Sequence, residues 1–413
     1  MKQIVGTLLT TSFTHQSDPE TAKTKRANGA QVNGQISAPV YDGNRERHIV
    51  PYITGNSVRG QLRRAGAEMV LKALHRPVSR ELFSILTCGK VGRGAIGFAP
   101  TATAVMNMDK DPFAGLFGGG CHMLRSAFTI GQLWPEVAWC LPLLHRDLRD
   151  AAIPDEKLRG TRKQLNDEGK FVDVPYPVKL VHDVLITSRD DLLNGKGASY
   201  VEDYENALEA WQKEVSDGNA AKAADKKAAR EARAKNEPYH SEGSKSSDNR
   251  MISGIESIVP GTPLQFWIML ENDPDGARLG LLLMAIRDFA NTNRLGGGAA
   301  RGFGRFQANL ALYEDDRLIV PSIFDPNTEA PAYTLVKDLN DYVAKAQAGL
   351  DALTVDMLDV TYGLPAWRKK QEQDAQKALK KAKGKAKNKG KGKDKEDGTD
   401  GTGAGDADVS EAA

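Results

Sequence analysis

The sequence predicts a mixed α+β fold, built as one large domain with insertions or as two domains. The β-branched, apolar stretch 3–11 is typical of a first strand. An amphipathic helix follows near residue 58, where apolar side chains recur at helical spacing. Farther along, a strand pattern at 257–270, an apolar helix pattern at 277–289 and a strand pattern at 305–312 follow in β–α–β order. A chain of 413 residues is long enough for either arrangement.

Composition narrows the class of protein. Hydrophobic residues make up 40% of the chain, and the formal net charge is only +2, so overall charge does not indicate a nucleic-acid partner. No apolar run approaches the ~20 residues of a membrane span, and the first residues do not resemble a signal peptide. The three cysteines form no Cys-x-x-Cys pair, so we expect neither a disulfide framework nor a metal site. The expectation is a cytoplasmic protein without cofactor.

The most informative stretch is 290–307, which lies between the apolar helix pattern and the last strand pattern. It contains five glycines, together with Arg294, Arg301 and Arg305. Glycine backbone adopts positive φ angles and approaches other chains closely. Guanidinium groups and the ring of Phe303 suit a phosphate-sugar strand with unstacked bases. The alternative is a tight turn with solvated arginines. A dinucleotide-binding fingerprint would lie between strand and helix, and so does not fit.

The predicted start of the first helix is a second anion-binding feature. Thr54, Asn56 or Ser57 can cap a helix that continues through an apolar stripe. Its amino-terminal N–H groups and the positive end of its dipole favour an anion. Because Arg59 and Arg63 are spaced i, i+4, we expect them to share a face beside the cap. The alternative is an ordinary capped helix with solvated arginines.

Two long stretches stand outside the predicted core. Residues 190–249 are first rich in Ala, Lys, Glu and Arg and then polar, which indicates a helical insertion followed by disorder. Residues 368–413 are Lys-rich and then Gly/Asp-rich without apolar periodicity, so we expect a disordered C-terminal tail. Its basic part, 369–395, could bind RNA or DNA nonspecifically or could act only as a solvated tail.

Two motifs, in order along the chain, resemble the RAMP superfamily. Residues 53–60 (Ile-Thr-Gly-Asn-Ser-Val-Arg-Gly) are similar to its helix start, Ile-Pro-Gly-Ser-Ser-hydrophobic-Lys/Arg-Gly. Residues 296–305 (Gly-Gly-Gly-Ala-Ala-Arg-Gly-Phe-Gly-Arg) are similar to its glycine-rich loop. Val-Pro-Gly at 259–261 and Leu-Phe-Gly at 116–118 occur in the order of a CRISPR effector backbone subunit of the Cas-seven type. Thr54, in place of the motif's proline, points to the type IV branch.

The resemblance covers about residues 1–365 and implies a modified RRM or ferredoxin-like core with a thumb and helical insertions. We therefore expect the core at 1–176 and 256–367, the thumb with its helical insertion at 177–255, and the tail at 368–413. In that family, copies stack into a helical filament along the CRISPR guide RNA (crRNA), and each thumb kinks the RNA. The implied partners are guide RNA, a DNA or RNA target paired with it, further copies of this chain, and other CRISPR effector subunits.

The expected RNA-binding residues combine the two motifs with the strand that returns from the thumb. Arginines and the helix cap would hold phosphates, glycine backbone would approach the RNA, and an apolar side chain at the thumb could wedge between bases. The set is Asn56, Ser57, Arg59, Arg63, Met251, Gly296, Gly297, Gly298, Arg301, Phe303 and Arg305.

We do not expect the protein to cleave RNA. Type III relatives cut target RNA with an aspartate upstream of the first helix, and Ser37 stands at the matching place. A serine without a base does not replace a carboxylate that binds metal or handles protons. Two alternatives stay open: a metal-dependent ribonuclease using Asp18 or Asp42, and a guide-processing ribonuclease using His15 or His48.

Overall fold

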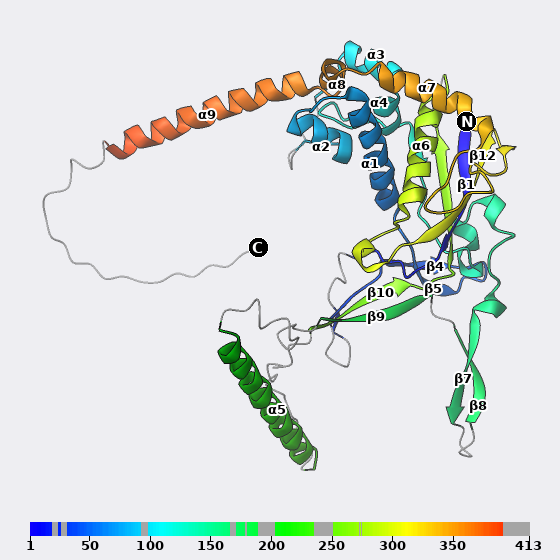
Figure 1. Cartoon of the computed structure of the whole chain (residues 1–413), viewed down its shortest axis with the longest axis vertical. Coiled ribbons are helices and arrows are strands. Elements are labelled where there is room, and N and C mark those ends of the chain that lie inside the picture. Colours follow the sequence, from blue (N-terminus) through cyan, green and yellow to red (C-terminus); the bar gives the residue numbers. More distant parts are fainter. Residues whose placement is uncertain are drawn as a thin grey trace, which may run out of the picture.

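The computed structural model describes residues 1–18, 24–25, 31–91, 98–165, 171–177, 180–188, 203–234, 251–271, 273 and 275–390. The fold is mixed α+β, as the sequence predicts. A helical body lies on a long sheet, and hairpins and two long helices project from it (Figure 1). Within the described part of the chain, no helix combines the length and the apolar character that a membrane crossing requires.

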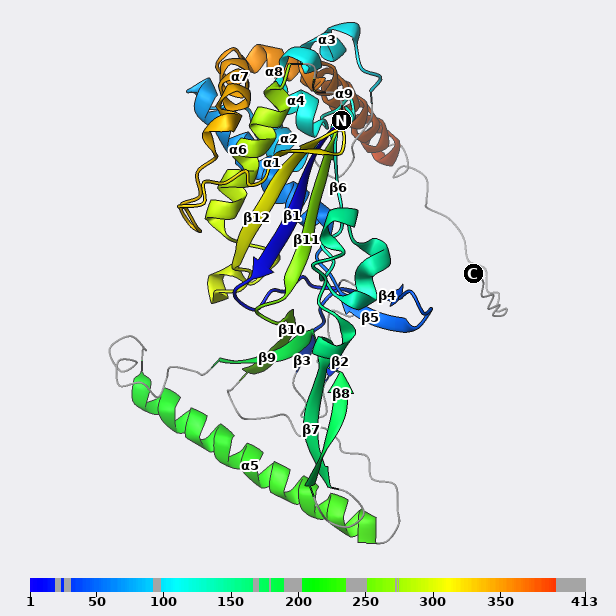
Figure 2. The same cartoon turned by 90° about the vertical axis from the view of Figure 1, so that its right-hand side faces the viewer.

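A five-stranded sheet forms the centre, in the order β13-β12-β1-β11-β6, with antiparallel neighbours throughout. The strands are β1 (Lys2–Thr10), β6 (Phe128–Ile130), β11 (Pro263–Leu270), β12 (Phe306–Glu314) and β13 (Arg317–Val320). Helix α1 (Gly55–Leu74) lies between β1 and β6 in the chain, and α6 (Ala277–Thr292) joins β11 to β12. Without β13, this is the β-α-β-β-α-β order of a ferredoxin-like core. Both helices lie on one face of the sheet (Figure 2).

Alternation along the strands decides which side chains meet the helices. Ile4 and Leu8 of β1 are at most 1% exposed and belong to the same core as the buried face of α6. At the end of α6, the rings of Phe289 and Phe306 lie 4.9 Å apart, so the helix is packed directly on the first residue of β12. The backbone that joins α6 to β12 therefore starts and ends at buried anchors.

Helix α1 begins where the sequence predicts. Thr54 has an extended backbone (φ −70°, ψ 137°), and its hydroxyl accepts a hydrogen bond from the amide of Ser57 at 3.3 Å. Val58 and Leu62, on the predicted apolar stripe, are fully buried. The helix ends at His75, which adopts a left-handed backbone (φ 48°) as helix C-termini often do.

Shorter helices gather at the other end of α1 and α6 (Figure 1). They are α2 (Arg80–Cys88), α3 (Ala102–Lys110), α4 (Pro112–Phe117), η7 (Lys337–Leu339), α7 (Asn340–Asp351) and α8 (Val355–Thr361). Asp111 caps α4, because its carboxylate accepts the amides of Phe113 and Ala114 at 2.8 and 3.1 Å. This layer closes the main core away from the glycine-rich loop.

The predicted insertion lies between β9 (Val181–Ser188) and β10 (Met251–Ile258), which pair antiparallel. It carries α5 (Tyr204–Ala234), which projects from the body (Figure 1). Strand β10 also pairs with β3 (Gln31–Asn33), and β3 pairs with β2 (Thr24–Lys25). This hairpin with its helix occupies the range expected for the thumb, and the proposed domain boundaries remain a prediction.

Two more hairpins stand beside the sheet. They are formed by β4 (Ser37–Tyr41) with β5 (Arg47–Pro51), and by β7 (Arg159–Leu165) with β8 (Phe171–Pro177). The 3-10 helices η1 (Ala138–Leu143), η2 (Arg146–Leu148) and η3 (Asp155–Leu158) lie between them in the chain. Val40 and Val50 of the first hairpin pack with Val137 and Cys140 in a second, smaller core. That packing fixes the first hairpin to the body.

The C-terminal region corrects one prediction. In place of a disordered tail from residue 368, helix α9 (Leu364–Gly390) extends away from the body (Figure 1). Ala, Lys and Gln are strong helix formers, so this composition favours a helix without an apolar stripe. Side chains 371–380 are all exposed. The rest of the predicted tail, 391–413, lies outside the described residues.

Candidate nucleic-acid interface

The glycine-rich loop between α6 and β12 needs its glycines for conformation. Gly296 and Gly304 have φ angles of 75° and 80°, which L side chains rarely adopt. A Cβ at Gly296 would lie 2.2 Å from the carbonyl oxygen of His15, and a Cβ at Gly304 would lie 2.2 Å from that of Leu295. Between them, Ala299–Arg301 forms the 3-10 turn η6. The loop is therefore a defined structure and not a loose connection.

The loop lies against the segment that follows β1. The amide of Gly297 donates to the carbonyl of His15 at 2.7 Å, and that of Gly304 donates to Phe13 at 2.8 Å. In the other direction, the amide of Thr11 donates to the carbonyl of Arg305 at 2.8 Å. These backbone bonds place the loop beside residues 11–15 like an added strand.

The same segment holds the tip of α1. The amide of Thr54 donates to the Gln16 side-chain oxygen at 2.9 Å, and the Gln16 side-chain nitrogen donates to the Thr54 hydroxyl at 2.7 Å. Because His15 and Gln16 are adjacent, the glycine-rich loop and the capped helix start meet at one end of the sheet. The two motifs that the sequence singled out thus share one surface. The sequence carried no signal for the bridging role of Gln16.

A buried polar network supports this junction. His15 is 4% exposed, and its ring nitrogens lie 2.6 Å from the carbonyl oxygen of Glu256 and 2.9 Å from the hydroxyl of Ser17. Burial lowers the pKa of His15, and the carbonyl and charge of Glu256 partly oppose that shift. Gln35, 3% exposed, accepts from the amide of Gln16 at 2.9 Å. These bonds make His15 part of the internal support of this junction, and a role for it in processing guide RNA stays a prediction.

The helix tip offers fewer free donors than the sequence suggests. The amide of Gly55 donates to the Gln132 side chain at 2.8 Å, and that of Ser57 is taken by Thr54. The amide of the exposed residue Asn56 has no acceptor within the described part of the chain. Asn56 is therefore the position on this tip that can receive an anion.

The arginines of the expected site have different surroundings. Arg301 and Arg305 are exposed, and no carboxylate pairs with either among the described residues. Arg59 is half-buried, with its guanidinium 5.3 Å from the centre of the Phe128 ring, and burial lowers its pKa. Arg301 and Arg305 can thus meet a phosphate directly, while Arg59 is only partly accessible.

Arg63 corrects the prediction, because it does not share the surface of Arg59. It is 7% exposed and donates to the carbonyls of Ile85, Leu86, Phe117 and Gly118 at 2.8 to 3.1 Å. The rings of Phe113 and Phe117 lie 5.5 and 5.8 Å from its guanidinium carbon. Arg63 therefore ties α1 to α2 and α4, with four of its five N–H donors engaged and its side chain buried away from an RNA strand.

Phe303 is also a correction. It is 9% exposed and packs under Gly298, so its face is closed to a base. The half-buried aromatic ring at this surface is Phe13, 6.2 Å from the Phe303 ring and stacked on the exposed His182 of β9 at 5.9 Å. Sequence reasoning missed Phe13 because only the tertiary fold brings β9 beside it.

Met251 is not brought to the loop. It is the first residue of β10, opposite Ser188, whereas Ile258 at the other end of β10 bridges to Thr14. Seven residues of strand separate the two ends by roughly 23 Å. The side chain of Met251 lies outside the described residues, so its role as a wedge stays a prediction.

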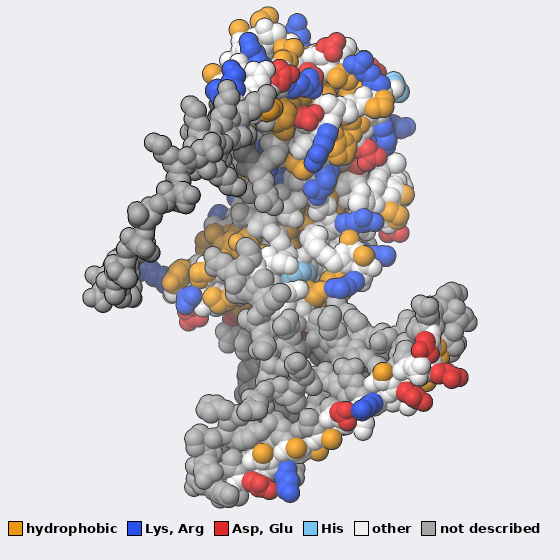
Figure 3. Space-filling view, turned by 90° about the vertical axis from the view of Figure 1, so that its left-hand side faces the viewer, with side chains coloured by type: hydrophobic (Ala, Val, Ile, Leu, Met, Phe, Trp, Pro, Cys, Tyr) orange, Lys and Arg blue, Asp and Glu red, His pale blue; other side chains and the backbone are white. Residues whose placement is uncertain are grey.

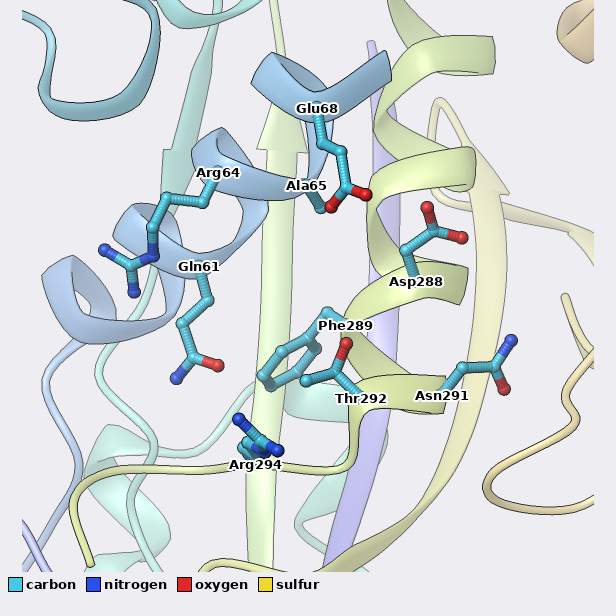
Figure 4. Close-up of a pocket in the computed structure, with 9 residues that line it drawn as sticks. All are labelled: Gln61, Arg64, Ala65, Glu68, Asp288, Phe289, Asn291, Thr292 and Arg294. Carbon is cyan, nitrogen blue, oxygen red and sulfur yellow. The ribbon is translucent and has the colours of Figure 1, made fainter. Parts of the chain in front are cut away.

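A cavity of about 530 Å³ opens between α1 and α6, next to the loop (Figure 4). It is lined by Gln61, Arg64, Ala65, Glu68, Asp288, Phe289, Asn291, Thr292 and Arg294. On the face of the body that Figure 3 shows, basic and acidic side chains are interspersed. Any attraction for an anion must therefore come from local groups such as these.

Two of the residues named for possible catalysis, Asp42 and His48, form a separate cluster with Glu46 on the β4–β5 hairpin. Ligand atoms of Asp42, Glu46 and His48 lie within 4.8 Å of one another, a spacing that could hold a metal ion. The Asp42 carboxylate already accepts two backbone amides at 2.9 Å, and it lies 3.0 Å from the ring nitrogen of His48. The hydrogen bond from His48 is the main reason that the pKa of Asp42 is lowered. These bonds close the hairpin turn, which explains the cluster without a metal.

Together, fold and site define a ferredoxin-like protein with a cationic loop-and-helix surface at one end of its sheet. No protein-family model matches the chain, and no curated protein matches it. Among solved structures, a chain described as "Type IV-B CRISPR Complex" is similar with a TM-score of 0.42 and 16% sequence identity. The match covers 76% of this chain and 91% of that chain.

Proposed function

We propose that this protein is a CRISPR effector backbone subunit of the type IV kind, which binds guide RNA and does not cleave it. The observation that supports the proposal best is the meeting of its two family-like motifs. The tip of α1 and the glycine-rich loop, far apart in sequence, are hydrogen-bonded to the adjacent residues Gln16 and His15. A helix tip, exposed arginines and bare glycine backbone on one surface suit a ribose-phosphate strand.

Each part of the surface has a distinct task in this proposal. Arg301 and Arg305 bind phosphates as charged forks, and the amide of Asn56 binds a further phosphate oxygen at the positive helix end. Gly297 and Gly302 are exposed, so RNA can approach their backbone closely. Phe13, with His182 stacked on it, provides the aromatic contact that Phe303 does not. None of these contacts reads the identity of a base, and base pairing with the target supplies sequence recognition.

Self-association along the RNA is the second half of the proposal. Copies would assemble in a row on one guide and join other effector subunits, with the hairpin β9–β10 and its helix α5 reaching towards a neighbour. Purified protein would then carry RNA in which nuclease protection repeats at a constant interval. RNA that is protected at one place only would contradict the assembly and leave RNA binding intact.

Binding to a labelled single-stranded guide RNA tests the first half. Arg301→Ala and Arg59→Ala should each weaken binding and lower the slope of log affinity against log salt by about 0.7, the value for one phosphate contact on a single strand. The control is Arg317→Ala, an exposed arginine beyond the far end of β12, roughly 30 Å from Arg305. If both test variants bind with the parent's affinity and slope, the proposal is wrong.

A metal-dependent ribonuclease is the second candidate, since Asp42, Glu46 and His48 lie within metal-binding distance of one another. A cleavage assay with complementary RNA and magnesium distinguishes it from the scaffold. Product that disappears in Asp42→Ala or Asp18→Ala would favour the enzyme. We expect no product, because the bonds of the Asp42 carboxylate are those of a hairpin turn. His48 as a guide-processing base would be tested by His48→Ala in the same assay.

A further inference from the structure

The cavity between α1 and α6 has two electrically different ends. Glu68 and Asp288 line one end, and Arg64, Gln61 and Arg294 line the other (Figure 4). Ala65 and the edge of Phe289 lie between them. Its volume of about 530 Å³ falls within the range of roughly 300–1,000 Å³ typical of ligand sites.

The acidic end is neutralised within the protein. Glu68 pairs with Lys72 at 2.9 Å, and Asp288 pairs with Arg287 at 2.8 Å. Nothing comparable holds the basic end, since neither Arg64 nor Arg294 has an acidic partner among the residues that the structure describes. The cavity therefore carries uncompensated positive charge at one end only.

That basic end faces the glycine-rich loop. Arg294 is the second residue after α6 and belongs to the loop itself. The Arg64 guanidinium lies back along α1 over Gly60, because a Cβ there would be 3.6 Å from its Nη1 atom. Long side chains on a helix point towards its N-terminus in this way, so Arg64 extends towards the tip held by Gln16.

We infer that this cavity is a phosphate-binding subsite for single-stranded RNA, in which Arg64 and Arg294 grip the strand from two different elements. The inference rests on the proposed function and extends the RNA path from the loop onto the helical face. Arg64 on α1 and Arg294 on the loop can each pair with one phosphate of a strand that passes this end of the cavity, and the Gln61 amide adds a neutral donor (Figure 4). Arg64 thus takes the part that the sequence assigned to Arg63.

The test uses the full chain and a fluorescently labelled single-stranded RNA of about 30 nucleotides, with binding measured over a range of potassium chloride concentrations. Each lost phosphate contact lowers the salt slope by about 0.7, which between 1 M and 0.15 M salt amounts to about 4-fold in affinity. The double variant Arg64→Ala/Arg294→Ala should lose roughly 14-fold and about 1.4 of slope. The matched pair Arg64→Lys/Arg294→Lys should keep the slope, because it keeps both charges.

The outcomes separate this inference from the proposed function. Unchanged binding by Arg64→Ala/Arg294→Ala, together with weakened binding by Arg301→Ala/Arg305→Ala, would overturn the subsite and leave the proposed function standing. No effect in either double variant would remove both. If Arg64→Ala/Arg294→Ala keeps its RNA affinity but sediments as a smaller assembly, the cavity is a contact between protein copies and the inference is wrong. Arg317→Ala should match the parent throughout, with equal melting temperatures as the check on folding.

Discussion

Arg63 and Arg64 are neighbours on α1, but Arg63 is buried and Arg64 is exposed. Alanine at position 63 should therefore lower stability, whereas alanine at position 64 should weaken RNA binding. Alanine at 63 leaves four buried carbonyl groups without the guanidinium that now donates to them. An unsatisfied buried acceptor costs about 1–3 kcal/mol, and water that enters the vacated space recovers part of this. We therefore expect Arg63→Ala to lower the free energy of unfolding by about 3–5 kcal/mol.

Arg64→Ala should change the free energy of unfolding by no more than about 0.5 kcal/mol, because the side chain is exposed and has no acidic partner in the described part of the chain. Urea unfolding followed by tryptophan fluorescence measures both variants. Titration of the folded proteins with RNA is the second measurement. Only Arg64→Ala should lower the slope of log affinity against log salt concentration. Two results would contradict a purely structural role for Arg63: a free energy of unfolding for Arg63→Ala within about 1 kcal/mol of the parent's, or the same loss of salt slope as in Arg64→Ala.

Gly296→Ala should destabilise by about 2–4 kcal/mol, because its Cβ would meet a carbonyl oxygen, whereas Gly302→Ala, at a similar φ of 79° in open space, should lose only about 1–2 kcal/mol; equal losses in thermal unfolding would contradict this. Burial lowers the pKa of His15, so its contribution to stability is complete above the unfolded value of 6.5 and is lost as pH falls below it. His15→Gln should flatten that part of a stability–pH profile, and an unaltered profile would argue against burial of the ring. Burial also raises the pKa of Glu136 from 4.5 to about 7, so stability falls as pH rises between these values. At pH 8, Glu136→Gln should therefore have a free energy of unfolding about 3 kcal/mol higher than that of the parent. An equal free energy of unfolding at pH 8 would contradict the raised pKa of Glu136.

Local chemistry explains which elements could be predicted. Strand β1, the cap of α1 at Thr54 and the succession β11, α6, glycine-rich loop, β12 depend on neighbours within a few residues. Strands β7 and β8 lack a regular apolar alternation, and their pairing with each other is the interaction that defines them as strands. For α9, the low-complexity composition predicted disorder where the structure has a helix. Lys and Ala are strong helix formers, so the same composition is also compatible with a helix.

Which side chains of the candidate site are accessible could not be predicted from local sequence patterns. Helical spacing places residues 59 and 63 on one face, but it cannot say which neighbour covers that face. The packing of α2 and α4 buries Arg63 and leaves Arg64 outside, and the turn at Gly298 closes over Phe303. Phe13 gained an aromatic partner because β9 lies beside it.

By itself the sequence determined the α+β class, the capped helix start and the position of a glycine-rich, arginine-bearing loop, since glycine conformation, capping and hydrophobic period are properties of short segments. Only the tertiary structure decided that these two segments meet through His15 and Gln16, and which arginines stay accessible. The physical reason is that burial and hydrogen-bond partnership depend on groups far away in the chain, which no local pattern contains.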